Sequence, residues 1–583
     1  MMETLENRQP GNRLFSFFKN TDPYVLVIVL LSIYIPLIGV NLYFRHDDAG
    51  TLLWAMDFKK SILHVFDPRP WFDEFNFYNG VGGYYRPFES LYIMMLVKIF
   101  GPTPFYFQLI NGMMVIATIV FMYKISAMLS NRFAGLLSAV IFHLAFQTLL
   151  YGTYHVVVPF GFFFEILTFY LFINGLYENN LRIILLGFLV MIPATNRQTT
   201  ALILTAIVVV FFIFHWRESK FQITQRIWIF ILAVLPNVLI PLTKNSSHAT
   251  ILNQPFSIAG YANYFWERFF FYSNLLTSRL PGLVILAIIL IYWFTKIPYK
   301  RLFPGLNRKL SLRLAIPLSL TFTMLALKIQ LLGIVLLYAG LIFIFFTNNK
   351  LQPVITWFFV SLGLFSIINF YHDAYFLEAA YALAIVLGVL LSNSIEVFQK
   401  AVAVQIKPKM ERLALVMGAC LIIAMGIVIW KVPSLPVIGK KVEAVKILIE
   451  TNKNFENMMS YLATNLPANA KVFQLSEEYL GLTMNERRFL SLRERAENVK
   501  VINILDSNVM IKVLGRWDVD FKHAEGLTLG IPENCVFIVH NKFEKHIAEK
   551  KFVLQPIKQF QNRNTEAVVY KVLSIKEGLY SKR

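Results

Sequence analysis

The chain has 583 residues, of which 56% are hydrophobic and only 15% are charged, and its mean hydropathy is +0.56. A soluble protein would carry roughly 25% charged residues, so the composition excludes an ordinary soluble globular protein. The formal charge of +20 invites a nucleic-acid partner, but the basic residues are scattered among apolar runs. Membrane topology explains that excess better, and we expect no nucleic-acid partner.

Apolar runs long enough to cross a bilayer recur along the first three quarters of the chain. A spanning helix needs about 20 mostly apolar residues, and this criterion predicts about thirteen spans, hence a polytopic α-helical membrane protein. The first run follows a polar segment and has no small-residue cleavage site, so we interpret it as a retained signal anchor. The predicted spans are 24–41, 105–129, 133–150, 156–176, 182–194, 199–215, 227–242, 281–295, 313–328, 330–347, 354–370, 375–391 and 413–430.

Basic residues in short loops predict the orientation of these spans. The segment 296–313 contains six basic residues and no acidic one, and the segments 216–226 and 392–412 are also net basic. If these segments face the cytoplasm, the N-terminus is inside and, with thirteen spans, the C-terminus is outside. The predicted organisation is a cytoplasmic N-terminus at 1–23, a transmembrane domain at 24–430 with outer loops 42–104 and 243–280, and an extracytoplasmic domain at 431–583.

Both outer loops and the C-terminal region have their own patterns. Residues 51–66 have the apolar periodicity of a helix lying in the membrane interface, with Trp54 at headgroup depth, and the second outer loop is equally aromatic. After about residue 435 the apolar runs shrink to strand length and alternate with helical segments. This alternation predicts a C-terminal soluble α/β domain. Its expected strands include 471–475, 535–540 and 567–572, and 454–464 is expected to be helical.

Asp47 and Asp48 follow the first predicted span. Carboxylates are costly near hydrocarbon, so such a pair either marks the end of the helix or has a function. Adjacent side chains diverge, so the pair cannot flank a scissile bond as the two acids of a glycosidase do. One acid can instead act as a general base on a hydroxyl while the other positions the acceptor or a cation. Chemistry with a base and no general acid suits a leaving group that is stable as an anion, such as a phosphate.

Four predicted outer turns carry a cation or a histidine flanked by aromatic residues. These residues are Arg86, His155, Arg197 and His372. Taken singly, each is most simply a residue that reaches toward the lipid headgroups. Their convergence on one face favours a set of fixed positive groups, which is what the developing charge of a departing phosphate requires.

The order of several motifs resembles a known family. An N-terminal span is followed by the acidic pair, a long loop with an interfacial helix, the Tyr85-Arg86-Pro87-Phe88 segment, then Phe100-Gly101-Pro102-Thr103-Pro104 and Gln108-Leu109-Ile110-Asn111 at the entry to the next span. Over about residues 20–400 this order resembles the C-superfamily of membrane glycosyltransferases, which have the GT-C fold. The nearest branches are the protein O-mannosyltransferase-like and aminoarabinose-transferase-like enzymes.

The resemblance implies roles for individual residues. Asp47 would be the catalytic base and Asp48 the neighbour that positions the acceptor. Arg86 and Arg197 match places where the family directs basic residues toward the lipid phosphate, although Arg197 stands where many relatives carry lysine. His372 stands where relatives often have arginine. Further substrate contacts are expected from Tyr85, Glu89 and His155.

These observations predict an inverting glycosyltransferase that moves a sugar from a polyprenyl-phosphate donor to an acceptor hydroxyl on the outer face of a membrane. The acceptor could be a protein, a lipid or a polysaccharide of the cell envelope. We expect a bacterial or archaeal plasma membrane and no cofactor, and the sequence leaves a divalent metal open. The alternative is a transporter or flippase of lipid-linked glycans. Such a protein would carry several polar or charged residues in the middle of its spans. Here the acidic residues in mid-span are few, and Glu165 is the clearest.

Overall fold

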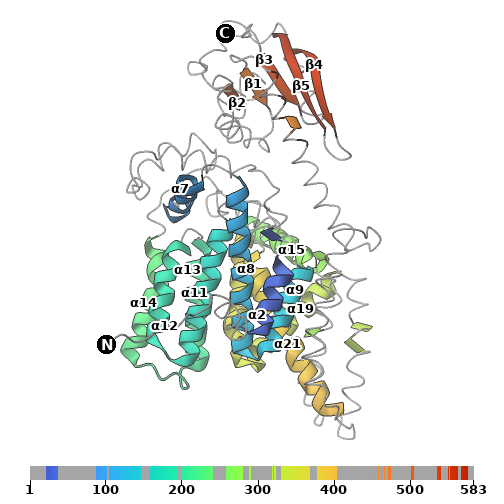
Figure 1. The fold of residues 1–583 in the computed structure, drawn as a ribbon. Coiled ribbons are helices and arrows are strands. Elements are labelled where there is room, and N and C mark those ends of the chain that lie inside the picture. The colour runs from blue at the N-terminus through green and yellow to red at the C-terminus, as the bar shows by residue number, and fades with distance from the viewer. Residues whose placement is uncertain are drawn as a thin grey trace, which may run out of the picture.

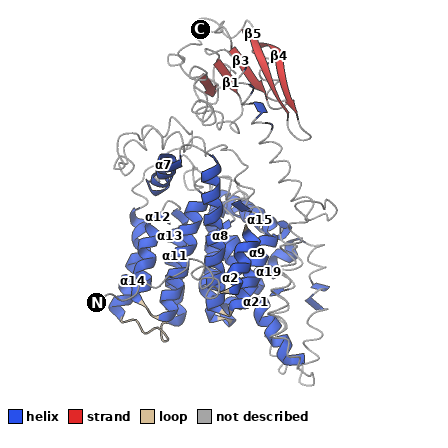
Figure 2. Cartoon of the chain, viewed as in Figure 1, coloured by secondary structure: helices blue, strands red, loops and turns tan. Residues whose placement is uncertain are grey.

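The computed structural model describes most of a helical bundle and several strands near the C-terminus. Figure 1 shows the helices side by side and the sheet beyond one end of them, and Figure 2 shows the same division by type of structure. The described residues are 22–33, 35–36, 87–100, 104–145, 158–194, 198–239, 258–279, 288–289, 318–319, 321–322, 330–367, 377–402, 454, 457, 458, 461, 465, 471–474, 500–503, 535–539, 549, 552–561 and 566–575.

Most of the helices coincide with apolar runs that were predicted to span the membrane. The agreement is closest for the predicted spans 105–129, 182–194, 199–215 and 330–347. The helices are α2 (Pro23–Ser32), α7 (Pro87–Phe100), α8 (Pro104–Leu129), α9 (Arg132–Ala145), α11 (Val158–Glu178), α12 (Leu181–Ala194), α13 (Gln198–His215), α14 (Ile223–Leu239), α15 (Ile258–Arg279), α19 (Gln330–Thr347), the 3-10 helix η5 (Asn349–Leu351), α20 (Gln352–Ile367) and α21 (Leu377–Val402).

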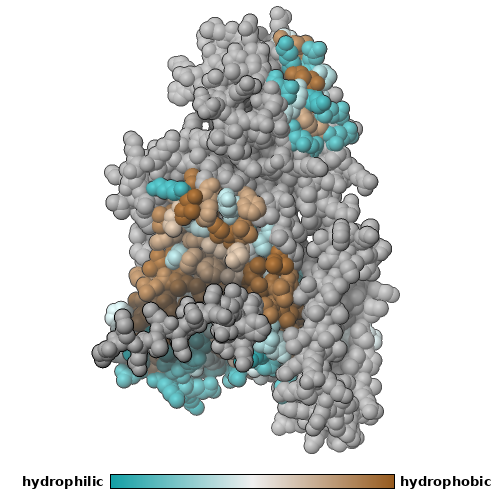
Figure 3. Space-filling model, viewed as in Figure 1, coloured by the Kyte–Doolittle hydropathy of each residue, from teal (hydrophilic) through white to brown (hydrophobic). Residues whose placement is uncertain are grey.

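Four helices in the described part of the chain are long and apolar enough to cross a bilayer on their own, and several shorter apolar helices accompany them. The four are Phe105–Leu129, Pro159–Glu178, Asn349–Ile367 and Leu377–Glu396. Large apolar side chains of α12 and α14 are exposed, including Leu189 and Trp228. Figure 3 shows a hydrophobic band on this face with hydrophilic residues below it, the pattern of a lipid-facing surface. The protein is a polytopic membrane protein, and the total of thirteen spans stays a prediction.

α8 and α11 run in the same direction. Tyr92 of α7 donates a hydrogen bond to Asn111 Oδ1 in the first half of α8 at 2.8 Å, and its ring stacks on Phe160 at the start of α11. Further along both helices, the rings of Phe121 and Tyr170 lie 5.5 Å apart. Both helices therefore begin at the end of the bundle where α7 lies, which we call the α7 end.

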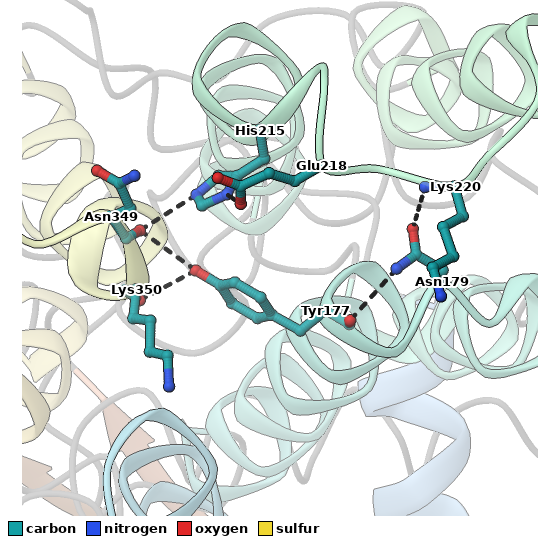
Figure 4. A network of polar contacts seen from close by, with 7 residues as sticks. All are labelled: Tyr177, Asn179, His215, Glu218, Lys220, Asn349 and Lys350. Atoms are coloured by element: carbon teal, nitrogen blue, oxygen red, sulfur yellow. Dashed lines mark hydrogen bonds and ion pairs between the residues drawn. The ribbon is translucent and has the colours of Figure 1, made fainter.

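A polar network ties several helix termini together at the opposite end (Figure 4). Tyr177, at the end of α11, donates to the backbone oxygen of Lys350 at 3.1 Å. His215, at the end of α13, contacts the backbone oxygen of Asn349 through Nε2 at 3.2 Å and the carboxylate of Glu218 through Nδ1 at 3.0 Å. Because α20 starts directly after these residues, it runs opposite to α11 and α13. We call this the Asp22 end, after the N-cap residue of α2.

Further contacts show in which direction α2, α8, α9 and α21 run between the α7 end and the Asp22 end. Asp22 caps α2 and accepts a hydrogen bond from the Tyr123 hydroxyl near the end of α8 at 2.6 Å. At the start of α9, Asn131 Oδ1 accepts a hydrogen bond from the Ser392 hydroxyl of α21 at 3.1 Å. α21 therefore passes its C-terminal half near the Asp22 end and begins at the α7 end.

The core of the bundle is apolar and aromatic, and α21 lies at its centre. Residues 377–390 of α21 are buried. The ring of Tyr381 stacks on Phe142 of α9 and meets Phe162 of α11 edge to face. A helix that is apolar on all sides must be surrounded by other helices, and this accounts for the central place of α21.

The C-terminal strands form one mixed sheet. Its strands are β1 (Lys471–Gln474), β2 (Lys500–Asn503), β3 (Cys535–Val539), β4 (Phe552–Gln561) and β5 (Glu566–Ile575), in the order β2-β1-β3-β5-β4. β1 is parallel to both of its neighbours, whereas β5 is antiparallel to β3 and β4. Strands lie at the three predicted places. The extent of an α/β domain over 431–583, and its position outside the cell, stay predictions.

Candidate functional site

The α7 end of the bundle gathers the starts of α8, α11, α13 and α21. Each helix start presents backbone N–H groups that have no partner within the helix, together with the positive end of the helix dipole. Because α9 and α20 run the other way and end here with the opposite partial charge, this preference for negative charge is local to the first turn of each helix that begins here. This is the property that a phosphate group would use.

Three of the predicted site residues shortly precede these helix starts in the sequence, and all of the predicted site residues except Glu89 lie outside the described residues. Arg86 immediately precedes α7, and Arg197 immediately precedes α13. His155 lies three residues before α11, and His372 lies five residues before α21. α11, α13 and α21 all begin at the α7 end, and the place of the predicted groups before them stays a prediction. Asp47, Asp48 and Tyr85 also lie outside the described residues.

α2 carries the chain toward the α7 end before the acidic pair is reached. α2 begins at the Asp22 end, and Pro36 beyond it lies against Gly112 of α8. A Cβ added to Gly112 would stand 2.6 Å from Pro36 Cα. Gly112 is about two turns from the start of α8, so the chain has already crossed most of the bundle by Pro36. The direction of α2 agrees with an acidic pair at the α7 end, although the place of that pair stays a prediction.

Glu89 is the predicted site residue that the structure describes. It lies in the first turn of α7, and its side chain is 4% exposed. A carboxylate in the first turn of a helix is favoured by the helix dipole. Because it is buried, Glu89 is not an ordinary surface acid. Its role in binding substrate stays a prediction.

A cluster of buried polar groups lies beneath α7. Asn111 and Gln108, one turn apart on α8, are both fully buried, and Asn111 accepts the hydrogen bond from Tyr92. Neither amide atom of Gln108 has a hydrogen-bond partner among the described residues. Buried amides usually have partners, so such a group calls for an explanation. Both residues belong to the Gln108-Leu109-Ile110-Asn111 motif of the sequence. Their burial and the contact with Tyr92 depend on how α7 packs, which the motif alone does not indicate.

Two further polar features at or near this end were missed by sequence reasoning. Thr199, in the first turn of α13, donates a hydrogen bond to the buried carboxylate of Glu378 at the start of α21, at 2.9 Å. Arg268, on the aromatic helix α15, is 4% exposed, and its guanidinium carbon lies 4.2 Å from the centre of the Tyr264 ring. In Figure 1, α15 lies nearer to the α7 end than to the Asp22 end. The signal that could have found both was a charged residue within a strongly apolar or aromatic run.

Glu165 is fully buried inside α11, about two turns from its start. Within the described part of the chain no group of three or more histidine, cysteine, aspartate or glutamate side chains is arranged to hold a metal ion.

Among the comparisons with known proteins, only the one with solved structures found a similarity. No model of a protein family matches the chain, and no curated protein matches it. Among the solved structures, ArnT from Cupriavidus metallidurans bound to undecaprenyl phosphate is similar over 94% of this chain and 98% of its own, with 10% identity and a TM-score of 0.44. ArnT is an aminoarabinose transferase of the GT-C group, the group that the sequence resembles. At this identity and TM-score the likeness by itself carries no conclusion about what this chain binds or does.

Proposed function

We propose that the protein is an inverting glycosyltransferase that takes a sugar from a polyprenyl-phosphate donor and transfers it to an acceptor hydroxyl on the outer face of the membrane. The observation that carries this proposal is the gathering of helix starts at the α7 end. Three of them directly follow segments that hold His155, Arg197 and His372. An apolar tail suits the lipid-facing surface of the bundle, and an anionic headgroup suits the helix starts and cations at its end.

The proposed reaction is a single displacement at the anomeric carbon. Asp47 takes the proton from the acceptor hydroxyl as its oxygen forms a bond to that carbon, and Asp48 holds the acceptor in place. The bond from the anomeric carbon to the phosphate oxygen breaks, and its electron pair leaves with the polyprenyl phosphate. Attack from the face opposite the leaving group inverts the configuration of the anomeric carbon.

The leaving phosphate needs positive groups rather than a proton donor, because it departs as a stable anion. Arg86 and Arg197 are proposed to hold it, with His372 and the helix starts adding to the positive field. Arg268 is a further cation for this role. Its planar guanidinium can bind two phosphate oxygens at once, and it lies over the ring of Tyr264.

The first experiment tests the base. The purified full chain, reconstituted in nanodiscs, is given a polyprenyl-phosphate sugar and an acceptor, and transfer is compared between wild type, Asp47→Asn and Asp48→Asn. Loss of a general base costs about 10²–10⁴-fold in rate, so Asp47→Asn is expected to fall by that factor and Asp48→Asn by less. Undiminished transfer by Asp47→Asn would remove Asp47 from this role. Absence of transfer by the wild type would favour the transporter alternative.

The second experiment tests the orientation. A tag at the C-terminal Arg583 is expected on the outer side of the membrane and a tag at the N-terminus on the cytoplasmic side, as the basic loops predict. A C-terminal tag found in the cytoplasm contradicts the thirteen-span arrangement. In that case, the side of the membrane on which the α7 end lies would have to be determined again.

A further inference from the structure

Two polar turns contact each other at one corner of the Asp22 end. The loop 216–222 joins α13 to α14, and the backbone N–H of Lys220 in this loop donates to Asn179 Oδ1 at 2.7 Å (Figure 4). Asn179 belongs to the turn between α11 and α12. In the same turn, Asn180 Oδ1 accepts a hydrogen bond from the backbone N–H of Arg182 at 3.0 Å. Two asparagine side chains therefore fix the backbone next to Lys220 and Arg182, and we call this region the Lys220 corner.

Arg226 of α14 holds the loop 216–222 in one conformation. Its Nε donates to the backbone oxygen of Phe221 at 2.9 Å, and its Nη2 donates to that of Ser219 at 2.8 Å. Its guanidinium carbon also lies 4.1 Å from the centre of the Trp216 ring. The loop thus has a defined shape, from which the side chain of Lys220 is exposed.

Basic side chains are in excess at the Lys220 corner. Glu218, the acid of the loop, contacts a histidine nitrogen at the end of α13 at 3.0 Å. Glu178, at the end of α11, is the other acid of the two turns. Arg182, Arg217 and Lys220 are exposed, and none of them forms an ion pair with the described part of the chain. These three cations are therefore available to a negatively charged ligand.

An exposed apolar row on α12 begins at one of these cations. Leu185, Leu186 and Leu189 are between 43% and 59% exposed. They follow Arg182 at intervals of three, four and seven residues, so they lie on the same face of the helix as Arg182. A charged residue at the end of a lipid-facing row lies at the depth of the lipid headgroups.

α14 has a second row of the same kind beside it. Ile223, Ile227 and Ile231 are exposed at intervals of four residues, and Lys220 lies three residues before the first of them. α12 and α14 contact each other. In Figure 3 the hydrophobic band of this face gives way to a hydrophilic patch toward the Asp22 end. Two adjacent apolar rows thus lead to one basic corner.

We propose that the Lys220 corner binds an anionic phospholipid. Its phosphate contacts Arg182 and Lys220, and its two acyl chains lie along the exposed rows of α12 and α14. The rows alone suit any phospholipid, whereas exposed cations at their headgroup end select a negative one. This inference goes beyond the proposed function, because the corner lies at the opposite end of the bundle from the α7 end and involves no sugar donor.

The test measures the dissociation constants of phosphatidylglycerol and phosphatidylcholine for the purified full chain in detergent, by native mass spectrometry. Wild type is expected to prefer phosphatidylglycerol. Each basic residue near the headgroups contributes about fivefold, so Arg182→Gln/Lys220→Gln is expected to bind phosphatidylglycerol about thirtyfold more weakly. Lys558→Gln/Lys571→Gln is the matched control, because it removes the same charge from exposed positions on the C-terminal sheet. Equal weakening by the two double variants overturns the inference.

Further measurements separate the headgroup charge from other causes. Arg182→Lys/Lys220→Arg keeps both charges and is expected to keep the preference for phosphatidylglycerol. The melting temperatures of all these variants in phosphatidylcholine nanodiscs are expected to match wild type, since the substituted side chains are exposed. Displacement of phosphatidylglycerol by an excess of glycerol phosphate would assign the corner to a free phosphate and overturn the lipid assignment.

The wild type alone provides a test that needs no variant to fold. Added salt screens exposed charges, so binding of phosphatidylglycerol is expected to weaken as the salt concentration rises, while binding of phosphatidylcholine is expected to stay the same. A wild type without preference for phosphatidylglycerol, or with a preference that salt does not reduce, overturns the inference. Neither result bears on the transfer of sugar, which is measured separately.

Discussion

Gly388 of α21 provides a quantitative test of how the central helix is held. A Cβ built on Gly388 would lie 2.0 Å from Ser138 Oγ, 2.6 Å from Ser138 N and 2.8 Å from Ala134 O, all in α9. Rotation of the serine side chain can relieve the first of these contacts. The other two involve backbone atoms, so Gly388→Ala must push α9 and α21 apart. That displacement matters because α21 begins at the α7 end.

The expected cost follows from two opposing terms. Overpacking a well-packed interface costs about 1–3 kcal/mol, while replacing a helical glycine with alanine gains about 0.5–1 kcal/mol. The net destabilisation expected for Gly388→Ala is therefore up to about 2.5 kcal/mol. Gly363, in α20, is the matched control, because a Cβ there meets nothing within 4 Å. Gly363→Ala is therefore expected to gain the helix stability of alanine without the cost of overpacking.

Thermal unfolding of the purified chain in one detergent separates the two variants. Gly388→Ala is expected to melt below wild type, and Gly363→Ala at or slightly above it. Binding of polyprenyl phosphate, measured well below the melting temperature, is expected to weaken in Gly388→Ala and to stay unchanged in Gly363→Ala. Equal melting temperatures for the two variants would refute the close packing of α9 on α21.

Three further substitutions test other contacts. Tyr92→Phe keeps the ring but removes the hydrogen bond to the fully buried Asn111, and an unsatisfied buried group costs about 1–3 kcal/mol, which differential scanning would register as a lower melting temperature. Asp22→Ala removes the N-cap of α2 and the acceptor of a tyrosine hydroxyl of α8, at an expected cost of about 1–2 kcal/mol that Asp22→Asn partly restores. Arg268→Gln is expected to weaken the binding of polyprenyl phosphate by about tenfold, with Arg268→Lys intermediate because it keeps the charge and loses the planar fork. An Arg268→Gln variant that binds as wild type does assigns its contact with Tyr264 to structure alone.

Bilayer length and local composition made the helices predictable. The span predicted at 105–129 is α8 (Pro104–Leu129), and the one predicted at 199–215 is α13 (Gln198–His215). Pro104 begins α8, and Arg217 follows soon after the end of α13, so the sequence marks the beginning of one apolar run and the end of the other. The run therefore indicates both the existence and the bounds of the helix.

Helices that continue beyond the apolar run were predicted too short. α21 was expected to end at 391, but it extends to Val402. Its last turns mix Ser, Asn, Glu, Gln and Lys with apolar residues, and this segment can stay helical after it leaves the hydrocarbon. β4 (Phe552–Gln561) was not among the strands named from the sequence, and it contains Pro556. Proline is tolerated in an edge strand, and β4 is the edge of the sheet, with a register shift at Pro556.

Some parts of the candidate site could be predicted from the sequence and others could not. Charged residues next to the ends of apolar runs pointed to Arg197 and His372, because a charge at the end of a span can be read from one segment alone. The bond between Thr199 and Glu378 could not be predicted in this way. It depends on two helices, separated by almost 180 residues of chain, that begin at the same end of the bundle, and neither segment alone carries information on its partner.

The most direct test of the proposed function is the product formed by the purified wild type from a polyprenyl-phosphate sugar of known anomeric configuration. With the acceptor present, the proposal predicts that polyprenyl phosphate and a glycoside of inverted configuration appear in equal amounts, and that Asp47→Asn forms neither at a comparable rate. A product with retained configuration would contradict the single displacement. Failure of the wild type to release polyprenyl phosphate from every donor and acceptor tested would contradict the assignment as a glycosyltransferase.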